Sequence, residues 1–269
     1  MAKKIILGKR ETLLVSEENI NFPRYFEMQE GRRYLRFSQG FHAVTERELT
    51  VRSDDGGKTW TETRGPDPHM TFEFEDGTLL ELGRGMYSNT YSTDLKYYGD
   101  PRVWIVGTGH STDGGQTWVK NLFHIVFPFA LDICHVEKGM HLLPDGTLLG
   151  VCVGRQEGGK NNISMLIASK DQGHTWDYRG TAGPPPSHRD RLGFGETGFA
   201  YHPPSGYMTA LFRPSRVLGP LYGTHSADLG YNWSDPEIVW GERGGAPRWG
   251  GIKPRQWMVR LRNTVDHLS

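Results

Sequence analysis

The feature that most restricts the fold of this chain is an eight-residue sequence that occurs four times. Its pattern is Ser-x-Asp-x-Gly-x-Thr/Asn-Trp, and it stands at 53–60, 111–118, 169–176 and 226–233 of the 269 residues. Successive copies begin 57 or 58 residues apart, and even spacing of this kind is the signature of a repeat architecture. Each copy is predicted to be a turn, in which the Asp accepts backbone N–H bonds, the Gly adopts a positive φ, and the Trp packs between repeats.

The same residues do not favour a metal loop. A calcium loop needs several oxygen ligands around one ion, whereas each copy supplies a single constant Asp. The 11 histidines show neither a His-x-His spacing nor the helical spacing of a zinc site. We therefore expect no metal and no cofactor.

A second repeated signal lies between the eight-residue copies. A short turn sequence with a glycine separates two apolar runs at Gly31, Gly77, Gly146 and Gly206, which is typical of a β-hairpin. Each repeat is then expected to form four antiparallel strands, and a period of roughly 40 to 60 residues with four strands is typical of a propeller blade. We predict an all-β single domain over 1–269: a β-propeller of about four and a half blades, the last half-blade from a partial fifth repeat at 250–269.

Composition excludes several classes of function. Lys+Arg and Asp+Glu both number 31, so no net charge attracts nucleic acid or an acidic membrane surface. The opening sequence MAKKIILGKRETLL lacks the apolar core of a signal peptide, and no apolar run reaches membrane-spanning length. We expect a cytoplasmic protein, or a secreted one if a leader was removed. Cys134 and Cys152 lie in apolar sequence and are expected to be buried free thiols.

The eight-residue repeat is similar to the Asp-box, or bacterial neuraminidase repeat, of the sialidase superfamily, and the resemblance runs from Phe22 to Val259. It implies a six-bladed propeller, relative to which this chain is incomplete. Because unpaired blade edges invite pairing, we expect either self-association or closure with five blades, using KKIILGKRETLLV as an outer strand.

Strand order places the candidate site at one end of the blades. The Asp-boxes and the hairpin turns share one end, so the starts of the inner strands and the ends of the second strands share the other, where propeller ligand sites gather. The polar residues predicted there are Arg24, His69, Glu196 and Arg255 at inner-strand starts, with Arg84, Arg155 and Arg213 at second-strand ends. The guanidinium fork suits a carboxylate, so an acidic ligand is expected.

The resemblance implies roles for some of these residues. Sialidases hold the substrate carboxylate with three arginines, which here would be Arg24, Arg213 and Arg255. Glu196, which lies 17 residues before Arg213, resembles the family glutamate that activates a tyrosine nucleophile. An acid that protonates the leaving oxygen would come from FHAVTERELTVRS, and among His42, Glu46 and Glu48 we select Glu46.

We therefore predict a sialidase-like glycoside hydrolase that acts on a glycan containing sialic or uronic acid. A polysaccharide lyase is one alternative, because His69 or His42 and a tyrosine could abstract a proton beside a uronic carboxylate; the tyrosines meant are Tyr87, Tyr91, Tyr97 and Tyr98. The other alternative is a non-catalytic propeller that binds a carbohydrate or a protein, since fold alone does not fix function.

Overall fold

The computed structural model describes residues 20–41, 44–68, 70–83, 99–183, 193–214 and 221–240. These residues form strands and no α-helix, in four antiparallel sheets of four strands each. The first sheet holds β1 (Ile20–Glu27), β2 (Arg33–Phe41), β3 (Val44–Ser53) and β4 (Thr61–Glu62), and the second holds β5 (Thr71–Glu73), β6 (Leu79–Leu82), β7 (Val103–Ser111) and β8 (Val119–Val126). The third holds β9 (Leu131–Leu142), β10 (Leu148–Gln156), β11 (Asn162–Ser169) and β12 (Asp177–Ala182), and the fourth holds β13 (Phe194–His202), β14 (Tyr207–Pro214), β15 (Leu221–Ser226) and β16 (Glu237–Trp240).

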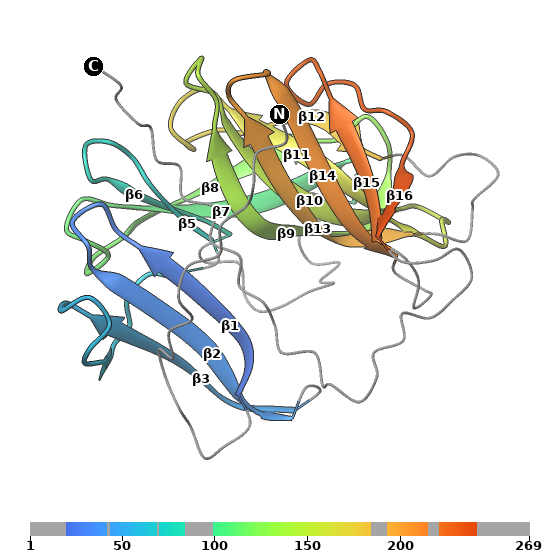
Figure 1. The fold of residues 1–269 in the computed structure, drawn as a ribbon. Coiled ribbons are helices and arrows are strands. Elements are labelled where there is room, and N and C mark those ends of the chain that lie inside the picture. Colours follow the sequence, from blue (N-terminus) through green and yellow to red (C-terminus); the bar gives the residue numbers. More distant parts are fainter. Residues whose placement is uncertain are drawn as a thin grey trace, which may run out of the picture.

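The four sheets are the blades of a β-propeller. Within each sheet the strands lie side by side in chain order, and the sheets follow one another around an arc with β1, β5, β9 and β13 innermost (Figure 1). The predicted all-β propeller is therefore confirmed, and the sheets are called blades 1 to 4. The partial repeat at 250–269 and the N-terminal strand expected at 3–15 lie outside the described residues. No helix that could cross a membrane is found in the described part of the chain.

The Asp-box turns have nearly identical hydrogen bonds in all four blades. In blade 2, Ser111 Oγ donates to Asp113 Oδ1 at 2.8 Å, and the same carboxylate accepts from the backbone N and Oγ1 of Thr117. Trp118 Nε1 donates to the carbonyl oxygen of Gly115 at 2.9 Å, so the indole is fixed against its own turn. The carboxylate thus bonds within its own loop, as a structural turn requires.

The fourth Asp-box shows why Asn can replace Thr. Asn232 Nδ2 donates to Asp228 Oδ2 at 2.7 Å, where the other boxes use the Thr hydroxyl. The backbone N of Asn232 also donates to the same carboxylate, at 2.9 Å. The position requires a short side chain with a donor, and the amide supplies it.

The Asp-box tryptophans of blades 2, 3 and 4 pack against the preceding blade, as predicted, whereas Trp60 packs within blade 1. Trp176 of blade 3 is 1% exposed and belongs to a core cluster with Leu80 and Phe123 of blade 2. Gly173 has a φ of +87°, and a Cβ there would lie 2.4 Å from Leu80 Cδ2. A larger residue at 173 would therefore force the blades apart as well as strain the turn.

The Asp-box carboxylates make stability depend on acid pH. The Thr117 side chain, its backbone N–H and the Ser111 hydroxyl lower the pKa of Asp113 from 3.8 to about 2. A depressed folded-state pKa stabilises the protein above the unfolded value, and that contribution is lost as pH falls. We expect the Tm of the wild type to fall between pH 3.8 and about 2 more steeply than that of Asp113→Asn, as measured by circular dichroism. Parallel pH profiles for the two proteins would contradict this role of the carboxylate.

Both cysteines are buried free thiols, as predicted. A hydrogen bond with Cys152 and burial together raise the pKa of the Cys134 thiol well above its usual value. Because the thiolate is the reactive form, we expect no reaction of Cys134 or Cys152 with a disulfide reagent such as dithionitrobenzoate in the folded protein. Both thiols should react after denaturation. Fast reaction under native conditions would contradict their burial.

Candidate functional site

Three of the inner strands are irregular near the end opposite the Asp-boxes, which we call the opposite end. In blade 1 the pairing of β1 with β2 shifts by one residue between Asn21 and Arg24. In blade 3 the pairing of β9 with β10 shifts at Arg155, and in blade 4 that of β13 with β14 shifts between Gly195 and Gly198. Such β-bulges re-aim side chains and are over-represented next to active sites. Each of the three lies at or beside a residue predicted for the site.

In blade 1 the bulge leads directly to a cluster of charges. Arg24 and Arg36 face each other across β1 and β2, and both approach Asp67 Oδ2, with Nη1 distances of 3.5 and 3.2 Å. Arg36 also pairs with Glu48 on β3. Glu81 of blade 2 accepts a hydrogen bond from the backbone N of Asp67 at 3.3 Å, so the cluster bridges two blades.

This cluster is partly withdrawn from water. The Asp67 side chain is 16% exposed and that of Arg36 is 26% exposed. Burial alone would lower the pKa of Arg36, but the carboxylates of Asp67 and Glu48 raise it overall. Arg24 was predicted to meet a substrate carboxylate, and the structure shows that it already has a carboxylate of the protein as a neighbour.

In blade 3 the predicted residue Arg155 lies beside an acidic partner. Arg155 Nε is 3.7 Å from Asp132 Oδ2, and both side chains are 34% exposed. Asp132 is the extra residue of the β9 bulge, and its carboxylate also accepts a hydrogen bond from the backbone N of Gly158 at 3.2 Å. The pair is accessible at the opposite end of this blade.

In blade 4 the backbone brings two predicted positions together. Arg213 on β14 is the Cα partner of Gly195 on β13, so it lies one residue from Glu196 across the pairing. The Arg213 side chain is exposed. For Glu196 in β13 and Glu46 in β3 the description covers the backbone only. The predicted residues His69, Arg84 and Arg255 lie outside the described residues, as do His42 and the four tyrosines of the lyase alternative.

Two further groups at the inner strands were not predicted. His135 Nε2 and Glu137 Oε1 on β9 are 3.0 Å apart, and each side chain is 17% exposed. They stand two residues apart, so the strand period puts them on one face. The second unpredicted group is Asp67, which lies between two prolines in the sequence GPDPH. Only its position in the connection between blades 1 and 2 could have indicated a role at the site. No group of three metal-ligating side chains is found among the described residues.

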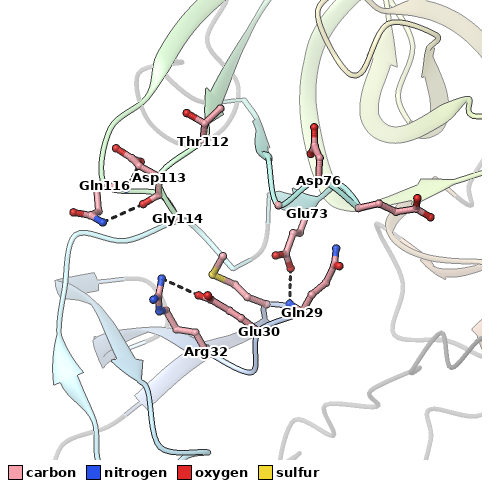
Figure 2. A pocket seen from close by; sticks show the side chains of 12 residues that line it. Gln29, Glu30, Arg32, Glu73, Asp76, Thr112, Asp113, Gly114 and Gln116 are labelled. Atoms are coloured by element: carbon pink, nitrogen blue, oxygen red, sulfur yellow. Dashed lines mark hydrogen bonds and ion pairs between the residues drawn. The ribbon is translucent and has the colours of Figure 1, made fainter.

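The Asp-box end holds a groove of different character. An open groove of about 510 Å³ lies between the hairpin turns of blades 1 and 2 and the Asp-box of blade 2. Five carboxylates and one guanidinium line it: Glu30, Glu73, Glu75, Asp76, Asp113 and Arg32 (Figure 2).

Several of these charged groups bond to the protein itself. The backbone N of Gln29 donates to Glu73 Oε2 at 2.7 Å, and Arg32 pairs with Glu30 at 3.0 Å. Burial raises the pKa of Glu73, and the charge of Glu30 adds to this effect. The excess of negative charge disfavours an acidic ligand here.

Comparisons with known proteins establish the fold. No family model and no curated protein matches the chain. The structure is similar to that of a protein of unknown function from Dyadobacter fermentans, with a TM-score of 0.58, 19% identity, and coverage of 82% of this chain and 69% of that one. It is also similar to the NanB sialidase of Streptococcus pneumoniae, with a TM-score of 0.55 and 12% identity over 85% of this chain and 53% of that one.

A third similar structure is the α-L-arabinofuranosidase Arb93A of Fusarium graminearum, with a TM-score of 0.53 and 14% identity over 81% of this chain and 67% of that one. The chain thus spans about half the length of the sialidase. At these identities the likeness shows the fold alone. The predicted likeness to the sialidase propeller is confirmed at that level.

Proposed function

We propose that the protein is a glycoside hydrolase that acts on an acidic glycan at the opposite end of the blades. The observation that carries the proposal is the set of three bulges in β1, β9 and β13, which lie at or beside Arg24, Arg155 and Glu196. Register shifts also occur elsewhere in the blades, but these three lie at or beside polar residues predicted for the site, and a bulge re-aims the side chains next to it. Similarity of fold to a sialidase and an arabinofuranosidase supports the class of reaction.

The charges favour an acidic sugar at that end. Arg24, Arg155 and Arg213 are all accessible in part or in full there, and a guanidinium can bind a carboxylate through two parallel hydrogen bonds. The acidic groove lies at the Asp-box end, so the two ends differ in the ligand that they favour. In this proposal Glu196 activates the nucleophile and Glu46 protonates the leaving oxygen, as the family resemblance implies.

One observation favours a second candidate, a hydrolase of neutral furanosides. Asp67 and Glu48 already balance the charges of Arg24 and Arg36, which leaves less positive charge in blade 1 for a substrate carboxylate. The similarity to an arabinofuranosidase is consistent with this candidate. The two candidate functions share the same type of reaction, glycoside hydrolysis, and differ in the sugar that is bound.

Two fluorogenic substrates test the proposal, a sialoside and an α-L-arabinofuranoside, assayed side by side with the full chain. Release of fluorophore from the sialoside alone supports the acidic glycan, and release from the arabinofuranoside alone supports the second candidate. Uronate polymers are assayed in parallel, where a rise in ultraviolet absorbance would reveal the unsaturated product of a lyase. The hydrolase proposal fails if no acidic or neutral glycoside is cleaved.

A further inference from the structure

Two buried hydroxyl groups meet at the joint between blades 3 and 4. Ser164 on β11 is 1% exposed and Thr197 on β13 is 2% exposed. Ser164 Oγ and Thr197 Oγ1 share a short hydrogen bond, and Ser164 Oγ also donates to the carbonyl oxygen of Phe194 at 3.3 Å. When Ser164 gives its one proton to that carbonyl, Thr197 is the donor to Ser164. The bonds form a chain from Thr197 through Ser164 to Phe194.

The chain of hydrogen bonds reaches into the β13 bulge. The pairing of β13 with β14 shifts between Gly195 and Gly198, so Glu196 and Thr197 form the bulge and Phe194 lies just before it. Phe194 packs with Ala182 of blade 3, and Thr197 bonds to Ser164 of blade 3, so both face the same neighbour. In a regular strand, residues three apart point to opposite faces. The Ser164 side chain therefore bonds both to Phe194, which precedes the bulge, and to Thr197, which lies within it beside Glu196.

The hydroxyl at this position is not a general feature of the blades. Ser164 stands five residues before the Asp-box serine of blade 3, and the corresponding residues are Glu48 in blade 1, Val106 in blade 2 and Leu221 in blade 4. Among these four, only blade 3 has a small hydroxyl residue there, and β11 of this blade contacts β13, the strand that carries Glu196. A role in blade building would call for similar residues in all four.

We propose that Ser164 is a positioning residue, which clamps the β13 bulge through Thr197 and Phe194 and so sets the backbone that presents Glu196. The inference rests on the proposed function for its effect on catalysis, but the clamp itself is a property of the described residues. A buried hydrogen-bonded chain rigidifies the segment that it ties. Reacting groups must be held to within about 0.5 Å of their productive geometry, so loosening the bulge should act on kcat.

The test uses three variants of the full chain: Ser164→Ala, the double variant Ser164→Ala/Thr197→Val, and Thr197→Ser. Ser164→Ala leaves the Thr197 hydroxyl buried without its acceptor, so stability falls. The double variant replaces both hydroxyls by apolar groups and should regain most of that stability. If Ser164 has only a structural role, the double variant should regain activity together with stability. A positioning role predicts that kcat stays reduced by about 10- to 100-fold with little change in KM.

Hydrogen exchange of the amides of residues 195–198 provides the second measurement, and it does not depend on activity. We expect faster exchange there in the double variant than in the wild type, at equal global stability. Thr197→Ser keeps the hydroxyl and should preserve both exchange and kcat. Thr108→Val removes a buried hydroxyl that has no hydrogen-bond partner among the described residues, on β7 of blade 2, and serves as a control for loss of a buried hydroxyl alone, with both quantities unchanged.

Unchanged exchange at 195–198 in the double variant, or recovery of kcat together with stability, would overturn the clamp. A wild type that cleaves no glycoside would instead overturn the proposed function and, with it, the catalytic role of the clamp. Exchange at the bulge would still decide whether Ser164 holds that segment. The two failures are therefore distinguishable.

Discussion

Replacing Trp176 by Ala is expected to lower the free energy of unfolding by about 3–5 kcal/mol, the range for deleting a large buried aromatic side chain. The indole is 1% exposed and its Nε1 donates to the carbonyl oxygen of Gly173 at 3.1 Å. It also lies against Phe123 of the preceding blade, with ring centroids 6.5 Å apart. The substitution therefore opens a cavity at the joint between blades 2 and 3. Urea denaturation followed by circular dichroism measures the loss.

Trp60→Ala is the matched control, because Trp60 holds the same Asp-box position in blade 1 but is only partly buried. We expect a clearly smaller loss of stability there. Equal losses of stability for the two variants would show that the tryptophan stabilises only its own Asp-box turn. The packing of Trp176 between blades 2 and 3 would then contribute nothing measurable to stability.

Glu196→Gln is expected to reduce kcat on the cleaved glycoside by about 10²- to 10⁴-fold, the range for a group that moves a proton or activates a nucleophile. Gln has the shape of Glu but no charge, so it removes the carboxylate chemistry, and the Tm is measured to show that the variant is folded. The measurement is steady-state hydrolysis of the fluorogenic substrate that the wild type accepts. Glu237→Gln on the outer strand β16, where the side chain is exposed, is the control and should retain full activity. If Glu196→Gln retains wild-type kcat, Glu196 has no part in the reaction.

The fold was predictable because its determinants are local and repeated. The hydrogen bonds of the Asp-box Ser, Asp and Trp side chains link residues at most four apart in sequence, such as Ser111 with Gly115 and Asp113 with Thr117. A motif with such short contacts keeps its structure wherever it occurs. Its fixed spacing predicted the four blades seen in the described residues and the end at which the turns lie; the predicted half-blade at 250–269 lies outside them. Even the exchange of Thr for Asn232 preserves the donor.

The site was less predictable because it depends on contacts between blades. The partnership of Arg24 with Asp67 joins residues 43 apart, and the hydroxyl pair of Ser164 and Thr197 joins residues 33 apart. The bulges shift strand register by one residue. Pro23 in β1 and Gly195 and Gly198 in β13 are residue types found at bulges, but they do not indicate which side chains the shift re-aims. Arg155 lies near the end of β10, whereas Arg24, expected at a strand start, lies inside β1. Strand order could not give the acidic partner of either arginine. His69, Arg84 and Arg255 stay predictions.

The central claim is that an acidic sugar binds at the opposite end and not in the groove at the Asp-box end. A crystal structure of Glu196→Gln soaked with sialic acid tests it most directly. The account predicts density for the sugar beside the starts of β1, β9 and β13, with its carboxylate within hydrogen-bond distance of at least one of Arg24, Arg155 and Arg213. Density in the groove lined by Glu30, Glu73 and Asp113, or none at the opposite end, would contradict it.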